Sequence, residues 1–178
     1  MDRLGYGARI FIGLVVVFLV LGARGPMTVT AQGRDVESEG IGLDRDEWEE
    51  LHGPGNAGQS YVEYEDGRYL VGFDDDAVTF IERGWEDEGN VTMDEAADEV
   101  DDLLPADAQL RETFYAPPTA AGPIGLFFER YQSDSLGERL ADAATARTDG
   151  ILVVYQQQRG QQIEPDVTRV SIAVGTAP

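Results

Sequence analysis

The sequence predicts an α+β fold in which two main helices cover one face of an antiparallel sheet. Two amphipathic segments with capping residues predict the helices, and short apolar runs bounded by turn residues predict the strands. Helix and strands follow in a similar order in both halves, which predicts two diverged helix-plus-strands repeats sharing one sheet. The expected divisions are a signal segment (1–31), a flexible acidic lead-in (32–42), a first repeat (43–90) and a second repeat (91–178).

Residues 1–31 are typical of a secretory signal peptide. Two arginines precede an apolar run over 10–21, and Val29 and Ala31 fit the small-x-small site of a signal peptidase. We therefore expect cleavage near Ala31 and a mature chain that is secreted or associated with the cell envelope. The alternative is an uncleaved N-terminal helix that anchors the chain, although the apolar run is shorter than the roughly 20 residues of a membrane span.

The first repeat begins with a short acidic helix. Asp44 and Glu47 are spaced as a capping box, and Gly53 followed by proline ends the helix. Asp66-Gly67 predicts a two-residue hairpin between the first two strands that follow. The expected strands of this half cover 60–65, 68–73 and 77–82.

The second repeat opens with a longer helix. Thr92 and Glu95 form another capping-box pattern, and Pro105 ends the helix. Its apolar stripe contains Ala96, Val100, Leu103 and Leu104. Strands are expected over 110–115, 124–131, 150–157 and 166–174, with a weak helical pattern over 135–146. The matched strand segments of the two repeats are 61–64 with 127–131, 68–73 with 151–155, and 78–81 with 167–172.

The amino-acid composition excludes several classes of chemistry. The chain has 34 acidic residues, 13 arginines, no lysine and no cysteine, so its formal net charge is -21. This charge argues against nucleic-acid binding, and the missing residue types exclude disulfides, thiolate metal sites, lysine Schiff bases and phosphate-binding P-loops. No cofactor is expected. An acidic, lysine-free chain also fits adaptation to high salt, where screening relieves like-charge repulsion.

Candidate catalytic and metal-binding residues are few. His52 is the single histidine, and its place in the last turn of a helix is explained by the helix dipole, so no catalytic residue is assigned. Two acidic runs are candidates for binding a divalent cation, with a solvated loop as the alternative for each. These candidates are Asp74, Asp75 and Asp76 in one run and Glu86, Asp87 and Glu88 in the other.

Aromatic side chains supply candidate interaction residues. The set comprises Trp48, Trp85, Tyr61, Tyr64 and Tyr69. Together they are consistent with an exposed platform for a ligand, and the alternative is that they form core or cross-strand pairs.

The first repeat also resembles a known protein architecture. Its helix ending in Leu51-His52-Gly53-Pro54 and the strands after it resemble the helix, Leu-Gly-x-Pro turn and strand pattern of small outer-membrane assembly lipoproteins. A tandem pair of such units is similar to the fold of β-lactamase inhibitor proteins. The resemblance implies a non-catalytic role in protein binding or in the envelope. The lipidated cysteine of the lipoproteins and the disulfides of the inhibitors are missing here.

These observations predict a secreted or envelope-associated, non-enzymatic interaction module. Its expected partner is a protein or a cell-surface polymer, basic ones included, and its mature form has no stable membrane span. Divalent cations remain open as ligands. The alternative functions are a secreted hydrolase that uses paired carboxylates and a calcium-stabilised envelope protein.

Overall fold

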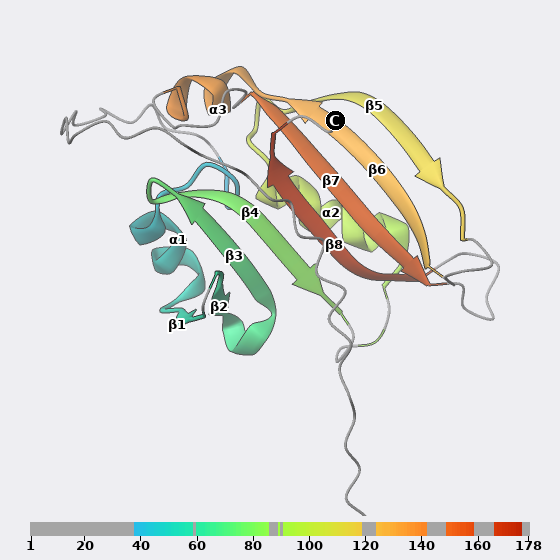
Figure 1. The fold of residues 1–178 in the computed structure, drawn as a ribbon, viewed down its shortest axis with the longest axis horizontal. Coiled ribbons are helices and arrows are strands. Elements are labelled where there is room, and N and C mark those ends of the chain that lie inside the picture. The colour runs from blue at the N-terminus through green and yellow to red at the C-terminus, as the bar shows by residue number, and fades with distance from the viewer. Residues whose placement is uncertain are drawn as a thin grey trace, which may run out of the picture. The chain divides into compact units, whose positions relative to one another are not determined.

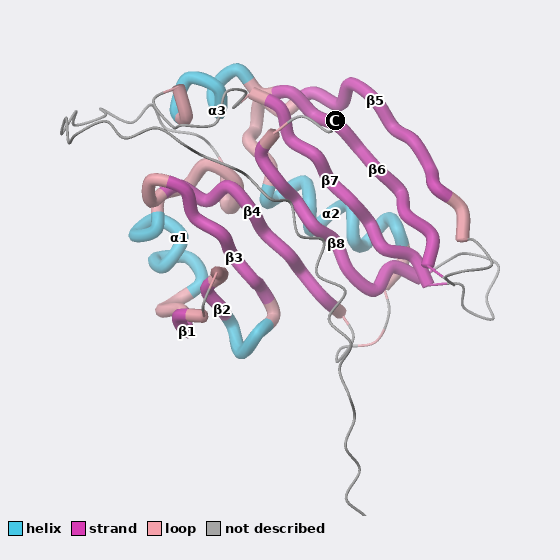
Figure 2. The backbone as a smooth tube through the Cα atoms, in the orientation of Figure 1, coloured by secondary structure: helices cyan, strands magenta, loops and turns pink. Residues whose placement is uncertain are grey.

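In the computed structural model, the unit over 32–178 contains one eight-stranded antiparallel sheet and three helices among its described residues (Figures 1 and 2). The structure describes residues 38–58, 60–85, 89, 91–118, 124–141, 149–158 and 166–175. The predicted signal segment lies outside these residues. The α+β class and the antiparallel sheet are confirmed.

The described elements have the following bounds. The helices are α1 (Arg45–His52), α2 (Met93–Leu103) and α3 (Asp134–Arg139), with a 3-10 turn, η1 (Glu65–Gly67). The strands are β1 (Asn56–Ala57), β2 (Val62–Tyr64), β3 (Tyr69–Asp74), β4 (Ala77–Gly84), β5 (Gln109–Ala116), β6 (Ile124–Gln132), β7 (Gly150–Gln158) and β8 (Asp166–Val174). Among the described residues, no helix has the length and apolar character needed to cross a membrane.

Both predicted capping boxes are present. At α1 the Asp44 carboxylate accepts from the Glu47 amide at 2.9 Å, and the Glu47 carboxylate accepts from the Asp44 amide at 2.8 Å. At α2, Thr92 and Glu95 make the same reciprocal pair. Helix α1 ends at Gly53, whose φ of 75° suits a residue without a Cβ. Local side-chain chemistry therefore fixes where the two main helices begin.

The folded unit begins earlier than predicted. The amide of Ile41 donates to the carbonyl of Leu103 at 2.9 Å, and the amide of Gly42 donates to the carbonyl of Val78 at 2.9 Å. The Ile41 side chain is fully buried. Residues 38–42 therefore pack against the end of α2 instead of forming a flexible lead-in, because Ile41 supplies an apolar side chain to the core.

The two-residue hairpin turn lies one connection later than predicted. Strands β2 and β3 close at the pair Tyr64 and Tyr69, so residues 65–68 form the connection and the prediction at Asp66-Gly67 is wrong. Strands β3 and β4 close at Asp74 and Ala77, leaving Asp75 and Asp76 as the turn. Their φ angles of 46° and 71° are the left-handed pair that a type I′ turn requires.

Both main helices cover the same face of the sheet. Trp48 of α1 meets the ring of Tyr69 edge-on at 5.9 Å, and Glu99 of α2 accepts from the hydroxyl of the same Tyr69 at 2.8 Å. Figure 1 shows the sheet from its other face, with α2 behind β7 and β8. The sheet residues that are fully buried on the covered face include Val71, Ile81, Val170, Ile172, Ile151, Val153 and Tyr155.

The strand order is β1-β2-β3-β4-β8-β7-β6-β5. Strands β4 and β8 pair at the middle, with Ile81 opposite Ile172. Outward from this pair, β3 and β2 follow on one side and β7 and β6 on the other. The first and second parts of the chain therefore meet through their last strands.

Candidate interaction surface

Four of the five aromatic candidates are buried. Trp48, Tyr64, Tyr69 and Trp85 are at most 5% exposed, because they lie between the sheet and its helices. The exposed platform predicted from these residues is therefore not formed, and the alternative assignment to the core holds for them. Tyr61 is the exception at 45% exposure, and its ring lies on the opposite face of the sheet, 5.1 Å from that of Phe80.

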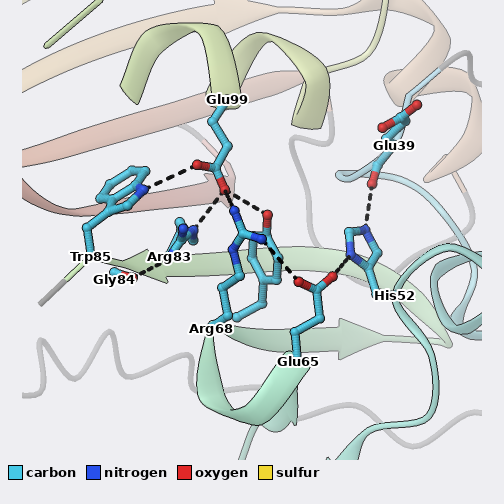
Figure 3. Close-up of polar contacts among 9 residues, drawn as sticks. Glu39, His52, Glu65, Arg68, Arg83, Gly84, Trp85 and Glu99 are labelled. Atoms are coloured by element: carbon cyan, nitrogen blue, oxygen red, sulfur yellow. Dashed lines mark hydrogen bonds and ion pairs between the residues drawn. The ribbon is translucent and has the colours of Figure 1, made fainter. Parts of the chain in front are cut away.

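The densest polar cluster surrounds Glu99 on α2 (Figure 3). One carboxylate oxygen, Oε1, accepts from the Tyr69 hydroxyl and from Arg83 Nε, both at 2.8 Å. It also accepts from Arg68 at 3.3 Å, while Oε2 accepts from the indole of Trp85 at 3.2 Å. Every one of these donors comes from β3, β4 or their flanking residues, so the cluster fastens α2 to the first half of the sheet.

In this cluster the buried charge of Glu99 is compensated by hydrogen bonds and by neighbouring arginines, as is typical of a structural ion pair. Burial alone would raise the pKa of Glu99, but hydrogen bonds from Arg83 and Tyr69 and the charges of Arg83 and Arg68 hold it below its usual value. Burial and the neighbouring Glu99 carboxylate raise the pKa of Tyr69. The sequence signal was an acid within the apolar stripe of α2, but its partners could not be read from local spacing.

His52 is held in the same region and has no nucleophile among its described contacts. Its Nδ1 lies 2.8 Å from Glu65 Oε1, and its Nε2 lies 3.4 Å from the carbonyl oxygen of Glu39. The ring stacks on Trp48 at 3.9 Å. Both ring nitrogens are therefore engaged in contacts that link α1 to the η1 turn and to the chain before α1, which is a structural arrangement.

A second group of polar residues forms a helix cap. Ser133 caps α3, and its hydroxyl donates to Asp107 at 2.6 Å. Asp107 also accepts from the amide and hydroxyl of Ser135 at 2.9 and 2.7 Å. Although burial opposes it, this set of hydrogen bonds lowers the pKa of Asp107. An Asp and two serines without an imidazole lack the general base of a hydrolytic triad.

A third carboxylate, Glu129 on β6, accepts from two phenols on the covered face. The hydroxyls of Tyr131 and Tyr155 each donate to Glu129 Oε2 at 2.9 Å. Burial and the adjacent carboxylate raise the pKa of both phenols. This cluster stabilises the second half of the core and was not identified from the sequence.

The acidic runs do not supply a described metal centre. Asp74 ends β3, and Asp75 and Asp76 form the β3–β4 turn, where Asp76 faces Arg45 Nε at 3.3 Å. No three acidic or histidine side chains converge on a common point anywhere in the described part of the chain. The second run, Glu86, Asp87 and Glu88, lies outside the described residues.

Three carboxylates border a depression beside α2. Its volume is about 370 Å³, and its lining consists of Ser38, Glu39, Asp101, Asp102, Leu104 and Ala106. This depression offers both acids and space to the alternative of a carboxylate-dependent hydrolase.

The face of the sheet opposite the helices carries an apolar surface, here called the open face. Side chains directly opposite one another on paired strands share a face. Two rows of such pairs therefore cross the open face. One row contains Gly72, Phe80, Ala173, Leu152, Arg130 and Glu112, and the other contains Leu70, Glu82, Ser171, Val154, Phe128 and Phe114.

The open face has aromatic pairs at both ends and few unpaired charges. Tyr61 and Phe80 meet at one end, and Phe114 stacks on Phe128 at the other with centroids 4.3 Å apart. Four charged residues pair across strands: Arg130 with Glu112 at 2.9 Å, and Arg169 with Glu82 at 3.1 Å. Within the described residues, no helix covers this surface.

No family model, no curated protein and no solved structure matches this chain. The resemblance to envelope lipoproteins and inhibitor proteins therefore remains a prediction from the sequence.

Proposed function

We propose that this chain is a secreted or envelope-associated, non-enzymatic interaction module that binds a protein partner on its open face. The observation that carries this proposal is the run of aliphatic and aromatic side chains from Phe80 to Phe114 across that face. Because four of its charged residues form ion pairs with one another, the middle of the face offers a partner apolar area with little charge to desolvate. A patch of this kind is characteristic of a binding surface.

Export is part of the same proposal. The signal pattern over 1–31 implies a mature chain that begins at Gln32. Mass measurement of the chain recovered from culture fluid and from the envelope fraction tests this. An intact N-terminus in the envelope fraction, with no chain in the culture fluid, would replace cleavage with an anchored form.

The strand order supports a duplicated origin of the two halves. The matched segments fall in β2 with β6, β3 with β7, and β4 with β8, which are equidistant from the middle of the sheet. Each half contributes one main helix, and these helices cover the same face. We infer that the resemblance to tandem helix-plus-strands proteins extends to architecture, and that a protein-binding role accompanies it.

The non-enzymatic part of the proposal is supported by the state of the candidate groups. The chain has no lysine or cysteine, its one histidine is engaged at both ring nitrogens, and its Ser–Asp cluster is a helix cap. The alternative is a hydrolase acting from the depression at Asp101 and Asp102. Turnover of a carbohydrate panel that disappears in Asp101→Asn would replace our proposal with that alternative.

The binding proposal is tested by capture from native envelope and culture fluid with the immobilised full chain. Leu152→Gln combined with Val154→Gln removes apolar area from the middle of the open face at constant charge. Leu51→Gln, on exposed α1, is the matched control. We expect one partner that is retained by wild type and by the control and lost by the double variant. Equal retention by all three chains would exclude the open face as the binding surface.

A further inference from the structure

Strand β5 ends the sheet with an unusually open edge. It pairs with β6 and has no second neighbour among the described strands, and all eight of its residues are exposed. At the opposite edge β1 has only two residues, and short edge strands resist pairing with other chains. Strand β5 has no proline or lysine. Its bulge lies between Leu110 and Glu112 and leaves residues 112–116 in regular register with β6.

The exposed apolar side chains concentrate at this same edge. Of the six large exposed apolar residues in the described ranges, four belong to β5 or the start of β6: Leu110, Phe114, Tyr115 and Ile124. Phe114 lies on the open face at 43% exposure, whereas Leu110 and Tyr115 lie on the helix-bearing face at 50% and 51%. A strand added beside β5 would cover apolar area on both faces and satisfy the outward backbone groups.

The charge distribution favours a second copy of this chain at that position. Helices α1 and α2 together carry ten acidic residues and one arginine, so contact between copies through the helices is repulsive. Strands β5 and β6 carry two arginines and two glutamates, which cancel. The β5 edge is therefore a place where two such acidic chains can meet without a local excess of like charge.

Pairing at this edge also keeps the acidic helices of the two copies apart. Helix α2 packs on β8, and β7, β6 and β5 separate β8 from the edge. Helix α2 also lies behind β7 (Figure 1), and five strand spacings of roughly 4.8 Å would put the two β7 strands about 24 Å apart. The Debye length is only about 10 Å at 0.1 M salt, so the helices would be screened from one another.

We propose that two copies of this chain associate by antiparallel pairing of β5 with β5, which joins two eight-stranded sheets into one. Such an interface has two-fold symmetry and is complementary to itself. It uses the edge of the sheet, so it does not depend on the partner proposed for the open face.

Sedimentation velocity of the full chain in about 1 M NaCl, where the Debye length falls to about 3 Å, tests the association. We expect a dimer whose fraction rises with protein concentration. Thr113→Lys places a charge at the centre of the edge and should abolish the dimer. Ala57→Lys adds the same charge at the other edge of the sheet, on exposed β1, and should leave it intact. Monomer at every concentration, or a dimer equally reduced by both variants, overturns the proposal.

Cross-linking gives a second test that survives if Thr113→Lys does not fold. The chain has no cysteine, so one introduced cysteine is its only thiol. In a two-fold antiparallel pair only a residue next to the axis faces its own copy, so one position among 112–114 should form an intermolecular disulfide on mild oxidation. Ala57→Cys should not. Equal cross-linking at all these positions indicates random collision and overturns self-pairing. Disulfide capture of a different protein by Thr113→Cys identifies another occupant and overturns it as well.

Discussion

Arg83 donates from Nε to Oε1 of Glu99 at 2.8 Å, and the Arg83 side chain is only 1% exposed. A charge so deeply buried is tolerated because it has a counter-ion and hydrogen bonds. Glu99 in turn lies on α2, so this pair connects the helix to β4. The Glu99 carboxylate is therefore a counter-ion of a buried guanidinium, and its removal should lower the stability of the fold.

We expect Glu99→Gln to lower the free energy of unfolding by about 3 kcal/mol, since it removes a charged partner from the buried Arg83 guanidinium. Asp98→Asn, on the exposed side of the same helix, is the matched control and should change stability by less than about 0.5 kcal/mol. Urea denaturation at neutral pH measures both. Similar losses in the two variants would show that the buried pair contributes little.

The free energy of unfolding that the Glu99 carboxylate contributes should also depend on pH. The folded-state pKa of Glu99 is lowered, so its stabilisation is present above the unfolded-state value of roughly 4.3 and is lost as pH falls through the folded-state pKa. The stability difference between wild type and Glu99→Gln should therefore shrink on acidification. A difference that is constant from pH 7 to about pH 3 contradicts a charge-based role.

Alkaline pH should destabilise the fold through its buried phenols. Burial and the adjacent Glu49 raise the pKa of Tyr64 to about 12, and the pKa values of Tyr69, Tyr131 and Tyr155 are raised as well. Above about pH 10 the unfolded chain loses phenolic protons that the folded chain keeps, so stability falls as pH rises. Urea midpoints measured from pH 9 upward, with phenolate absorbance in parallel, test this.

A single variant tests how much of the alkaline destabilisation comes from the phenol of Tyr155. Tyr155→Phe removes one of these phenols and should make the loss of stability above about pH 10 less steep. It also removes a donor to Glu129, so its stability at neutral pH should drop by about 1–3 kcal/mol. An unchanged slope would assign the alkaline transition to other groups.

The β3–β4 turn offers a stabilising substitution. Asp75 and Asp76 both have positive φ, for which Asn-Gly is the preferred pair in a type I′ turn. Asp75→Asn with Asp76→Gly should raise the free energy of unfolding by about 1 kcal/mol, because the exposed contact between Asp76 and Arg45 contributes little. Asp76→Ala is the control and should give no gain. Thermal unfolding of the wild type, the double variant and Asp76→Ala shows whether a change in stability comes from relief of backbone strain or from loss of the ion pair.

Salt should stabilise the folded chain. Its formal charge is -21, and neighbouring acids on α1 and α2 repel one another at low ionic strength. The melting temperature should rise between dilute buffer and about 1 M NaCl, where the Debye length is about 3 Å. An isomolar series of a neutral osmolyte separates screening from general exclusion effects. A flat or falling melting temperature in NaCl would remove the argument for adaptation to high salt.

Local chemistry in the sequence was sufficient to predict the helices and most strands. Asp44 and Thr92 each start a helix through contacts within three residues, and the strand over 150–157 follows from its own apolar run. The two-residue turn was assigned to Asp66-Gly67 because Gly is the usual signal, whereas the structure places aspartates in the left-handed positions at 75 and 76.

The candidate site was harder to predict from the sequence because it depends on the register between paired strands. Tyr61 and Tyr64 belong to the same predicted strand, yet one is exposed and the other buried, and only pairing with β3 determines which face each residue occupies. The contacts of Glu99 with Arg83 and Tyr69 join segments 16 and 30 residues apart. Spacing within one element carries no signal for such contacts.

The position of β8 has a consequence for how the chain reaches its folded state. This last described strand is inserted between β4 and β7, so neither half of the sheet can be joined to the other before residues 166–174 are present. Until then the edge of β4 that pairs with β8 is free. The sheet is therefore completed only when β8 pairs with β4, a contact between residues far apart in the sequence, and such contacts slow folding.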